Sequence, residues 1–326
     1  MRAIVIDQPG DESVLHLGEV PRPDLRSDQI RIRVRATAVN RADLLQRQGL
    51  YPPPPGASPI LGLECAGEVV EIGADVTGWR RGDRAMALLT GGGYAEEAVV
   101  HHGSALPVPG VFSDVEAAAF PEVFLTAFLN IFLLGDPPSQ GAVLVHGGGS
   151  GVGTAAITLC KEAGLRVLVT AGSEEKCRRC RSHGADLAIN YRDGDFSAAV
   201  AAATAGRGVD VVLDSIGGRY LAQNLGVLAP GGKLVIIGLM GGARAEIDLA
   251  ALLLKRLHVV GSTLRARPVE EKASIVRALE SRFGAALRAG RLRPVVDRVF
   301  PLGEAAEAHR WVQSSRHFGK VVLQVA

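Results

Sequence analysis

The feature that most constrains the fold is a regular alternation of apolar runs and amphipathic segments that begins at Gly141. Short runs rich in Val, Leu and Ile indicate buried strands, and the segments between them have helical periodicity. The predicted strands are 142–145, 166–171, 186–190, 209–214, 233–239 and 257–261, and the predicted helices are 151–163, 174–183, 196–203, 220–228 and 249–254. Strands that alternate with helices in this way form a parallel, doubly wound sheet, so the middle of the chain is predicted to be an α/β domain.

The two flanking segments have a different pattern. Runs 1–6, 30–38 and 65–72 are rich in Val and Ile and are separated by turn clusters, which is typical of an all-β domain. After Thr263 a helix (269–289) and two strand-like runs (295–300 and 320–325) do not continue the alternation, and we expect this tail to rejoin the first domain. The predicted division is therefore 1–122 with 264–326 as one domain and 123–263 as the other.

Composition excludes several classes of protein. The 326 residues carry a net charge of +2 without a long run of one sign, which argues against a nucleic-acid or membrane-surface partner. The longest apolar window, 123–134, is shorter than the roughly 20 residues that span a bilayer. Four cysteines do not form a disulfide framework in a chain of this size, and the first residues lack a signal-peptide pattern. We expect a cytoplasmic protein.

The strongest local motif is VLVHGGGSGVGTAAITLCKEAG, a strand followed by a glycine turn and a helix. Such a turn places a pyrophosphate on exposed N–H groups at the helix N-terminus, where the helix dipole favours negative charge. When Gly148 and Gly153 are aligned with the outer glycines of G-x-G-x-x-G, Ser150 takes the middle position and can add a hydroxyl donor. The turn, including Gly151 and Val152, is predicted to bind a dinucleotide; a purely structural turn is the alternative.

The end of the second strand predicts which dinucleotide binds. NAD sites place an acid there to accept from the ribose 2′-hydroxyl. Here Gly172 stands at that position, followed by Ser173 and, one turn later, Lys176, a pattern that suits a 2′-phosphate. Glu174 and Glu175 favour NAD, although acids in the first turn of a helix are also explained by its dipole. The sequence therefore favours NADPH over NADH.

Several stretches together resemble a known family. They are VNRADLLQRQGLYPPPP, ILGLECAGEVVEIG, HGGGSGVGTAAI, GADLAINYRDGDF, VDVVLDSIGG, GGKLVIIGLMGG and FGKVVL, and they cover nearly the whole chain. The chain resembles the zinc-free branch of the medium-chain dehydrogenase/reductase superfamily, specifically the zeta-crystallin-like NADPH:quinone oxidoreductases. This resemblance implies a GroES-like β-rich domain, built from both chain ends, into which a doubly wound Rossmann domain is inserted.

The same comparison bears on metal binding. Zinc-dependent relatives have a His where Leu63 stands, a Cys where Asn40 stands, and four closely spaced cysteines for a structural metal. The chain has no cysteine between Cys65 and Cys160, so we expect no zinc at either site. The Cys177-x-x-Cys180 pair with His183 is interpreted as ordinary residues on an exposed helix, with a metal or redox role as the alternative.

The resemblance assigns roles to particular residues. Asn40 is expected to bond the nicotinamide ribose or the substrate, Tyr51 to form a wall of the substrate site, and Thr126 to hold the carboxamide. Two further sets are implied: Gly238, Met240 and Leu264 around the nicotinamide, and Ser173, Lys176, Tyr191 and Arg316 around the 2′-phosphate. Asn40 could instead be a helix cap and Tyr51 a solvated loop aromatic. A second tyrosine common in the family is Leu45 here, which leaves the shape of the substrate open.

These features predict an NADPH-dependent quinone oxidoreductase that transfers hydride, or single electrons, to a quinone without zinc. Without a Lewis acid the acceptor must be electrophilic by itself, as quinones and activated enones are. Two alternatives remain: an enoyl or alkenal double-bond reductase, which needs a fixed acid, and a cofactor-binding protein without turnover. A homodimer or homotetramer is expected, with a small-molecule quinone or enone as substrate.

Overall fold

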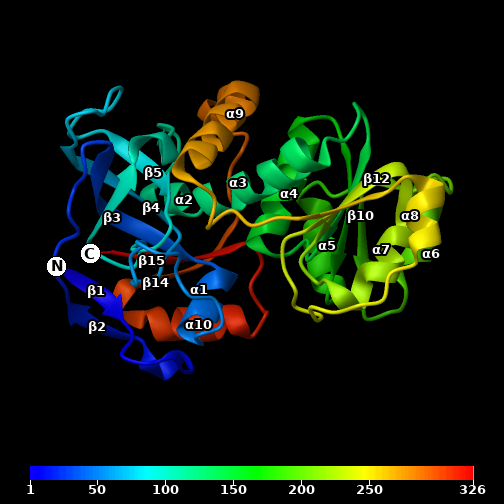
Figure 1. The fold of residues 1–326 in the computed structure, drawn as a ribbon, viewed down its shortest axis with the longest axis horizontal. Coiled ribbons are helices and arrows are strands. Elements are labelled where there is room, and N and C mark those ends of the chain that lie inside the picture. The colour runs from blue at the N-terminus through cyan, green and yellow to red at the C-terminus, as the bar shows by residue number, and fades with distance from the viewer. Residues whose placement is uncertain (326) are drawn as a thin grey trace. The chain divides into compact units, whose positions relative to one another are not determined.

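The computed structural model describes residues 1–325 and consists of two compact units. Unit 1 contains Met1–Leu125 and Leu264–Ala326, and unit 2 contains Thr126–Thr263. Helix α3 (Pro121–Phe128) carries the chain from the first unit into the second. Figure 1 shows the ribbon with the elements labelled.

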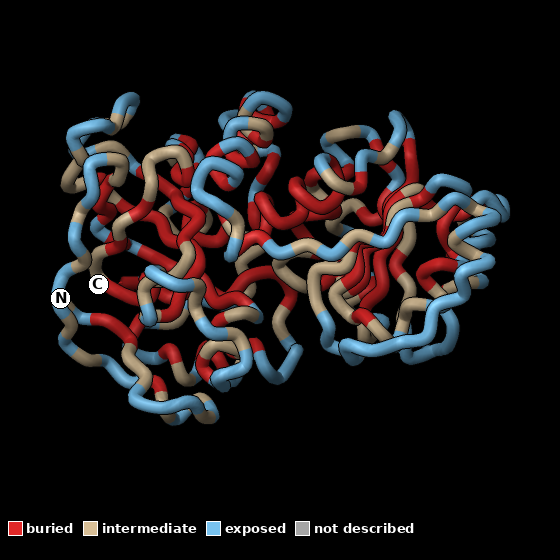
Figure 2. The backbone as a smooth tube through the Cα atoms, viewed as in Figure 1, coloured by how far each residue is buried: buried red, intermediate tan, exposed pale blue. Residues whose placement is uncertain are grey.

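Unit 2 is built on a six-stranded parallel sheet with the strand order β10-β9-β8-β11-β12-β13. The strands are β8 (Ala142–His146), β9 (Arg166–Ala171), β10 (Leu187–Asn190), β11 (Val209–Asp214), β12 (Leu228–Ile236) and β13 (His258–Gly261). The helices are α4 (Gly151–Glu162), α5 (Glu174–Ser182), α6 (Phe196–Ala203), α7 (Leu221–Val227) and α8 (Leu249–Lys255). The central strands are buried, as the tube of Figure 2 shows, because helices cover the sheet.

Unit 1 is β-rich. A seven-stranded sheet has the order β14-β15-β3-β4-β5-β7, with β6 also paired to β3, and β1 pairs with β2 in a separate two-stranded sheet. The strands are β1 (Arg2–Val5), β2 (His16–Glu19), β3 (Gln29–Val39), β4 (Glu64–Ile72), β5 (Arg84–Leu88), β6 (Glu97–His101), β7 (Ala105–Pro107), β14 (Val296–Pro301) and β15 (Lys320–Gln324). The helices are α1 (Arg41–Arg47), α2 (Asp114–Ala118), α9 (Val269–Arg288) and α10 (Ala305–Gln313).

The last strand joins the tail of the chain to its beginning. β15 pairs antiparallel with β3 in the register Val321 to Val39 and Leu323 to Thr37. This pairing brings Lys320, the first residue of β15, beside the end of β3, where Asn40 begins helix α1. The tail therefore completes the sheet of unit 1 and carries one charged side chain into its interior.

The predicted fold class, a doubly wound parallel sheet together with a β-rich unit built from both chain ends, is confirmed. The interpretation of Cys177 and Cys180 as surface residues is wrong, because both are fully buried on the inner face of α5. The strand expected at 233–239 is also displaced: β12 covers Leu228–Ile236, and residues 237–239 follow it as a loop. Helix α10 had no counterpart in the sequence prediction.

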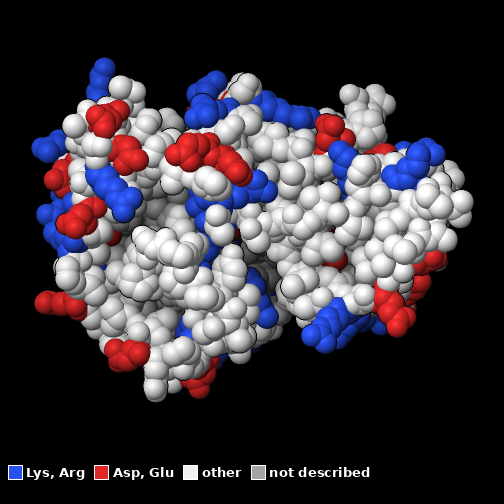
Figure 3. All heavy atoms as spheres, viewed as in Figure 1, with Lys and Arg blue, Asp and Glu red and all other residues white. Residues whose placement is uncertain are grey.

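The surface charge and the length of the apolar helices bear on possible partners. Figure 3 shows basic and acidic side chains interspersed on the visible face, without a large area of one sign. Within residues 1–325, no helix combines the length and the apolar character that a membrane crossing requires.

Candidate active site

The glycine turn after β8 is shaped by close backbone packing. Gly147 has a φ of +77°, a conformation that favours glycine. A Cβ atom on Gly148 would lie 2.6 Å from the side chain of Val169, and one on Gly153 would lie 2.3 Å from the carbonyl oxygen of Gly147. Ser150 is the N-cap of α4, and its Oγ accepts from the Gly153 N–H at 3.0 Å. The Ser150 hydroxyl therefore acts first as a cap, and its own hydrogen remains available to donate.

The end of β9 has Gly172, and therefore no side chain, at the position where NAD sites place an acid. A Cβ atom on Gly172 would lie 2.5 Å from the hydroxyl oxygen of Tyr191. Ser173 caps α5 by accepting from the Lys176 N–H at 3.2 Å. Glu174 forms an ion pair with Arg181 on the same helix, and its carboxylate is thereby engaged. Tyr191 thus lies against Gly172, and Ser173 and Lys176 follow in the first turn of α5. We call these four residues of unit 2 the Gly172 cradle.

Gly238 and Met240 lie beyond the carboxyl end of β12. The Met240 N–H donates to the carbonyl of Ser215, which follows β11, at 3.2 Å. A Cβ atom on Gly238 would lie 3.0 Å from the same carbonyl oxygen. The loops that follow β8, β9, β11 and β12 therefore meet at the carboxyl edge of one parallel sheet, which is where open α/β sheets bind their ligands.

Thr126 is the first residue of unit 2 and is 8% exposed. Its Oγ1 is buried and has no hydrogen-bond partner among the residues described. Four residues further on, Asn130 donates from Nδ2 to the Thr126 carbonyl at 2.7 Å, and its Oδ1 is also unpaired. Buried polar atoms without a partner are rare in proteins. An orphaned hydroxyl at this position fits the carboxamide that the resemblance assigned to Thr126.

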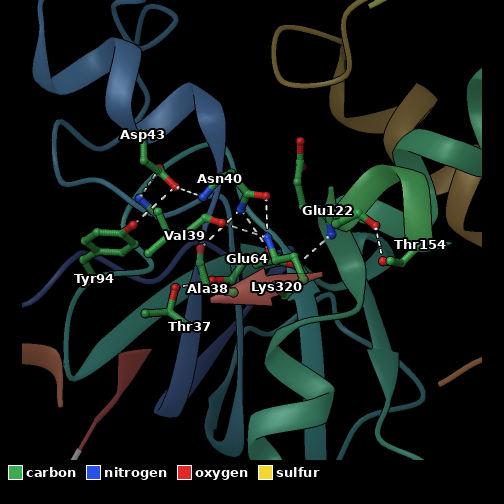
Figure 4. A network of polar contacts seen from close by, with 12 residues as sticks. Thr37, Ala38, Val39, Asn40, Asp43, Glu64, Tyr94, Glu122, Thr154 and Lys320 are labelled. Carbon is green, nitrogen blue, oxygen red and sulfur yellow. Dashed lines mark hydrogen bonds and ion pairs between the residues drawn. The ribbon is translucent and has the colours of Figure 1, made fainter. Parts of the chain in front are cut away.

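Asn40 lies in a cluster of buried polar side chains in unit 1, which Figure 4 shows pointing toward one another. Asn40 Oδ1 accepts from the Lys320 ammonium at 2.6 Å, and Asn40 Nδ2 donates to Glu64 Oε1 at 2.9 Å and to the Ala38 carbonyl at 3.2 Å. Lys320 and Glu64 form an ion pair at 2.7 Å, with their side chains 3% and 0% exposed. Both amide hydrogens of Asn40 are used within the protein, so its remaining capacity is to accept a hydrogen bond at Oδ1.

Asn40 also takes the N-cap position directly before helix α1, the position that its alternative interpretation as a cap assigns to it. Its backbone N–H donates to Asp43 Oδ2 at 2.7 Å, and Gly62 N–H donates to Asp43 Oδ1 at 3.0 Å. Asp43 is fully buried, and burial raises its pKa to about 6. The Asn40 side chain, however, faces Glu64 and Lys320 and does not cap the helix. It is therefore held both at its backbone and at its amide.

Leu63 and Asn40, at the positions that the resemblance equates with zinc ligands, are not metal ligands in this structure. Leu63 is a buried core residue, and the Asn40 amide is engaged as described. Among residues 1–325, no three His, Cys, Asp or Glu side chains are placed to hold a metal ion together.

Glu122 lies beside this cluster. Its backbone N–H donates to Glu64 Oε2 at 2.9 Å, and Figure 4 shows its side chain extending away from Glu64 and Lys320. Desolvation, reinforced by the neighbouring Glu64 carboxylate, raises the pKa of Glu122 to about 8. The Glu122 carboxyl is therefore mostly protonated at neutral pH and can donate a proton.

Tyr51 is half-buried and lies against a basic side chain. The Arg265 guanidinium carbon lies 5.4 Å from the centre of the Tyr51 ring, and Arg265 Nη1 is 3.5 Å from the Tyr51 carbonyl. Burial raises the pKa of the Tyr51 hydroxyl, although Arg265 opposes the rise. Tyr51 is thus ordered by its neighbour and is not the solvated loop aromatic that was considered as the alternative.

The remaining predicted residues belong to unit 1. Leu264 is 6% exposed and directly precedes Arg265. Arg316 is exposed, and its guanidinium carbon lies 4.3 Å from the centre of the Trp311 ring. The structure groups Asn40 with the buried ion pair and groups the glycine turn with the Gly172 cradle. That the two groups share one cofactor stays a prediction.

Five charged residues of the site were missed in the sequence: Glu64, Glu122, Arg265, Lys272 and Lys320. A signal was available for three of them. Glu64 stands in LGLECAG, Glu122 in AAAFPEVFLTAF and Lys320 in FGKVVL. An apolar run is usually buried, and a charged residue is almost never buried unless it is paired. A single charge within such a run therefore indicates a buried polar contact.

A β-rich unit closed by the end of its own chain, combined with a doubly wound parallel sheet, defines the class of medium-chain dehydrogenases and reductases. Two family models match: the alcohol dehydrogenase GroES-like domain over residues 26–110, and the zinc-binding dehydrogenase domain over residues 151–281. Quinone oxidoreductase of Rattus norvegicus is 30% identical over 326 residues, which cover 99% of this chain and 97% of that protein.

A second relative is much longer than this chain. A phenolphthiocerol/phthiocerol polyketide synthase of Mycobacterium tuberculosis is 33% identical over 98% of this chain, and the chain spans only 14% of the length of that protein.

Three solved structures share the fold over the whole chain. An NAD-dependent alcohol dehydrogenase is 33% identical with a TM-score of 0.87, over 100% of both chains. The CurK enoyl reductase is 28% identical with a TM-score of 0.86, over 100% of this chain and 99% of that one. The quinone oxidoreductase of Escherichia coli complexed with NADPH is 26% identical with a TM-score of 0.83, over 99% of this chain and 100% of that one. The chain belongs to the quinone oxidoreductase-like family of the medium-chain dehydrogenase/reductase superfamily, and it is an oxidoreductase of that family.

Proposed function

We propose that the protein is an NADPH-dependent quinone oxidoreductase that works without zinc. The observation that carries the proposal is the cluster of Asn40, Glu64 and Lys320. The resemblance puts Asn40 at a position where zinc-dependent relatives have a cysteine ligand, and here the Asn40 amide bonds the buried Glu64–Lys320 ion pair. NADPH supplies a hydride when it is bound, and an acceptor such as a quinone takes it up without Lewis-acid assistance.

The cradle at Gly172 supports NADPH over NADH. Gly172 offers no carboxylate to the ribose of NAD, and an aspartate in its place would have to displace the Tyr191 hydroxyl, which lies 2.5 Å from the added Cβ. Ser173 and Lys176, in the first turn of α5, would donate to a 2′-phosphate. The resemblance adds Arg316 of unit 1 to this set, which stays a prediction. The orphaned Thr126 Oγ1 would hold the carboxamide, and the N-terminus of α4 would receive the pyrophosphate.

The acceptor would lie against Tyr51 and near Asn40. The ordered Tyr51 ring offers an apolar face to a planar molecule. Asn40 would accept from a hydroxyl group through Oδ1, because its amide hydrogens are already used. Glu122, with its pKa raised to about 8, would supply the proton that a reduced quinone takes up.

One observation favours a second candidate function, the reduction of an enoyl double bond. Such a reaction needs a fixed acid, and the Tyr51 phenol, whose pKa is raised by burial, keeps a proton that it could donate. The similarity to an enoyl reductase structure supports the same candidate.

The variants Tyr51→Phe and Tyr51→Ala, measured as kcat/KM with a quinone and with an enone, separate the two functions. If Tyr51 only stacks on a quinone, the Phe variant loses at most about tenfold and the Ala variant loses more. If the phenol is a general acid for a double bond, the Phe variant loses about 100- to 10,000-fold. A collapse of the Phe variant on quinones would contradict the proposal, and equal activity of the Ala variant on both substrates would remove Tyr51 from the site.

We also propose a homodimer in the cytoplasm as the working form. The edge strand β13 leaves Val259 41% exposed, and Leu253 and Leu254 on the neighbouring α8 are 78% and 77% exposed. An unpaired strand edge beside apolar side chains fits a second copy of the same sheet. Light scattering of Leu254→Glu should then report a monomer where the unmodified protein is dimeric.

The four free cysteines suit a reducing compartment.

A further inference from the structure

We propose that Arg265 and Lys272 form an oxyanion site beside Tyr51, which receives the negative oxygen that an acceptor acquires when it is reduced. The inference rests on the proposed function and deepens it, because it names the class of acceptor: a molecule whose reducible bond is conjugated to a carbonyl. Neither residue is part of the zinc position, the glycine turn or the Asn40 cluster.

The two cations converge on one residue. Arg265 Nε donates to the Thr90 carbonyl at 2.9 Å, and Lys272 Nζ donates to Thr90 Oγ1 at 2.9 Å. Lys272 Nζ also donates to the backbone carbonyl of Arg265 at 2.6 Å, and Arg265 Nη2 donates to Gln46 Oε1 at 2.6 Å. All of these residues belong to unit 1, so their arrangement does not depend on unit 2.

Both charges are buried without a counter-ion. Arg265 is 4% exposed and Lys272 is 3% exposed, yet every polar partner named above is neutral, and neither cation forms an ion pair within residues 1–325. Buried Arg and Lys are normally paired with an anion, because desolvating an unpaired charge is costly. The contrast within the same unit is Lys320, whose ammonium is paired with Glu64.

The nearby acids offset the charge of this pair only in part. The charge of Glu122 acts on both cations, but the same carboxyl has its pKa raised to about 8 and is mostly neutral at pH 7. Asp43, whose pKa of about 6 leaves it ionised at pH 7, offsets part of the charge of Arg265 from a distance, and its two oxygens are bound by backbone N–H groups. Burial is the largest cause of the lowered pKa of Lys272, and the charge of Arg265 lowers it further. The two cations, Arg265 and Lys272, therefore keep a net positive charge.

Unused donors remain to bind an oxygen. A guanidinium has five N–H groups and an ammonium has three. Arg265 uses three of its hydrogens and Lys272 uses two, so two hydrogens of Arg265 and one of Lys272 have no acceptor among the residues described. The Arg265 guanidinium also faces the ring of Tyr51, the proposed wall of the acceptor site.

The chemistry of reduction supplies the missing anion. A reduced nicotinamide gives a hydride, which is one proton and two electrons, and is itself oxidised. Addition of that hydride to a neutral quinone or enone gives a phenolate or enolate monoanion, and one further proton completes the product. A positive charge that is already fixed beside the oxygen stabilises the monoanion in a site with little water.

A phenol probe tests the site without turnover. The protein, saturated with NADP⁺, is titrated with p-nitrophenol, whose phenolate absorbs in the visible and whose neutral form does not. An opposite charge within hydrogen-bond reach lowers the pKa of an acid by about 1 to 3. We therefore expect the pKa of bound p-nitrophenol to lie about 1 to 3 below that of the free phenol, and Lys272→Met to remove about half of this difference or more.

Two control variants define the result. Lys272→Arg should retain the lowered pKa of the bound phenol. Lys255→Met removes another lysine that donates to backbone carbonyls, in unit 2, and should change nothing. The proposal is overturned if the unmodified protein binds p-nitrophenol without lowering its pKa or does not bind it, or if Lys272→Met folds and binds the phenol with an unchanged pKa. If no acceptor oxidises NADPH but the bound phenol still ionises more readily, the proposed function fails while the oxyanion site stands.

Discussion

Replacing Lys320 by methionine would remove the ammonium group from the buried Glu64 carboxylate while keeping the length of the side chain. The pair is 2.7 Å apart, and its side chains are 3% and 0% exposed, so water cannot take the place of the lost charge. Removing one partner of such a pair costs about 3 to 5 kcal/mol. Glu64 would keep the Asn40 amide and the Glu122 N–H as donors, which favours the lower part of this range.

The loss of a second hydrogen bond increases the expected destabilisation. Asn40 Oδ1 accepts from Lys320 at 2.6 Å, and a buried hydrogen bond that is broken costs about 1 kcal/mol more. We therefore expect a decrease of about 4 kcal/mol in the free energy of unfolding of unit 1. For a unit of this size the decrease corresponds to a Tm lower by roughly 8 to 16 °C.

The assay is urea unfolding of Lys320→Met, Glu64→Met and the double variant, followed by circular dichroism. An apolar pair often replaces a buried ion pair at little cost, so the double variant should be more stable than either single variant. The matched control is Lys161→Met, because Lys161 pairs with Asp186 at a similar 2.9 Å but on the surface. The control should lose at most about 1 kcal/mol. A loss below about 1 kcal/mol for Lys320→Met, or strictly additive effects in the double variant, would refute the reasoning.

Three further predictions concern the cofactor and a titrating carboxyl. Lys176→Ala should weaken NADPH binding by about 1 to 3 kcal/mol with little effect on NADH, as titration calorimetry would show; equal losses for both cofactors would contradict the assignment. Gly172→Asp should place a carboxylate against the 2′-phosphate and weaken NADPH binding by at least about tenfold, and unchanged affinity would show that the cradle is not the phosphate site. Glu122 has an ordinary pKa of 4.5 and a folded pKa of about 8, so the native state binds the extra proton between these values and stability falls as the pH rises through that window. Glu122→Gln should remove on the order of a few kcal/mol of this decrease, measured by urea unfolding from about pH 4.5 to above pH 8, and an identical pH profile would disprove it.

The parts of the fold that depend on local pattern could be predicted from the sequence. The parallel strands are visible as short Val-rich runs, and the glycine turn as a set of residues that only a tight backbone approach requires. Helix α5 shows the limit of this approach. Its composition is strongly polar, so Cys177 and Cys180 were assigned to the surface, yet their spacing of three puts both on the one buried face.

The charged residues of the site could not be placed because their partners are distant in sequence. Lys320 meets Asn40 only because β15 pairs with β3, a contact between opposite ends of the chain. Arg265 and Lys272 meet at Thr90 in the same manner, and nothing in the sequence around Thr90 indicates a cation. Motif spacing reports local geometry, whereas these contacts depend on the tertiary fold.

Steady-state oxidation of NADPH and of NADH by the purified protein, with a panel of quinones and enones as acceptors, tests the central claim most directly. The account predicts turnover with NADPH and quinones, at a kcat/KM at least about tenfold above that for NADH, which corresponds to the loss of one charge-assisted hydrogen bond to the 2′-phosphate. A preference for NADH, a restriction to enones, or no oxidation of either cofactor by any acceptor would contradict it.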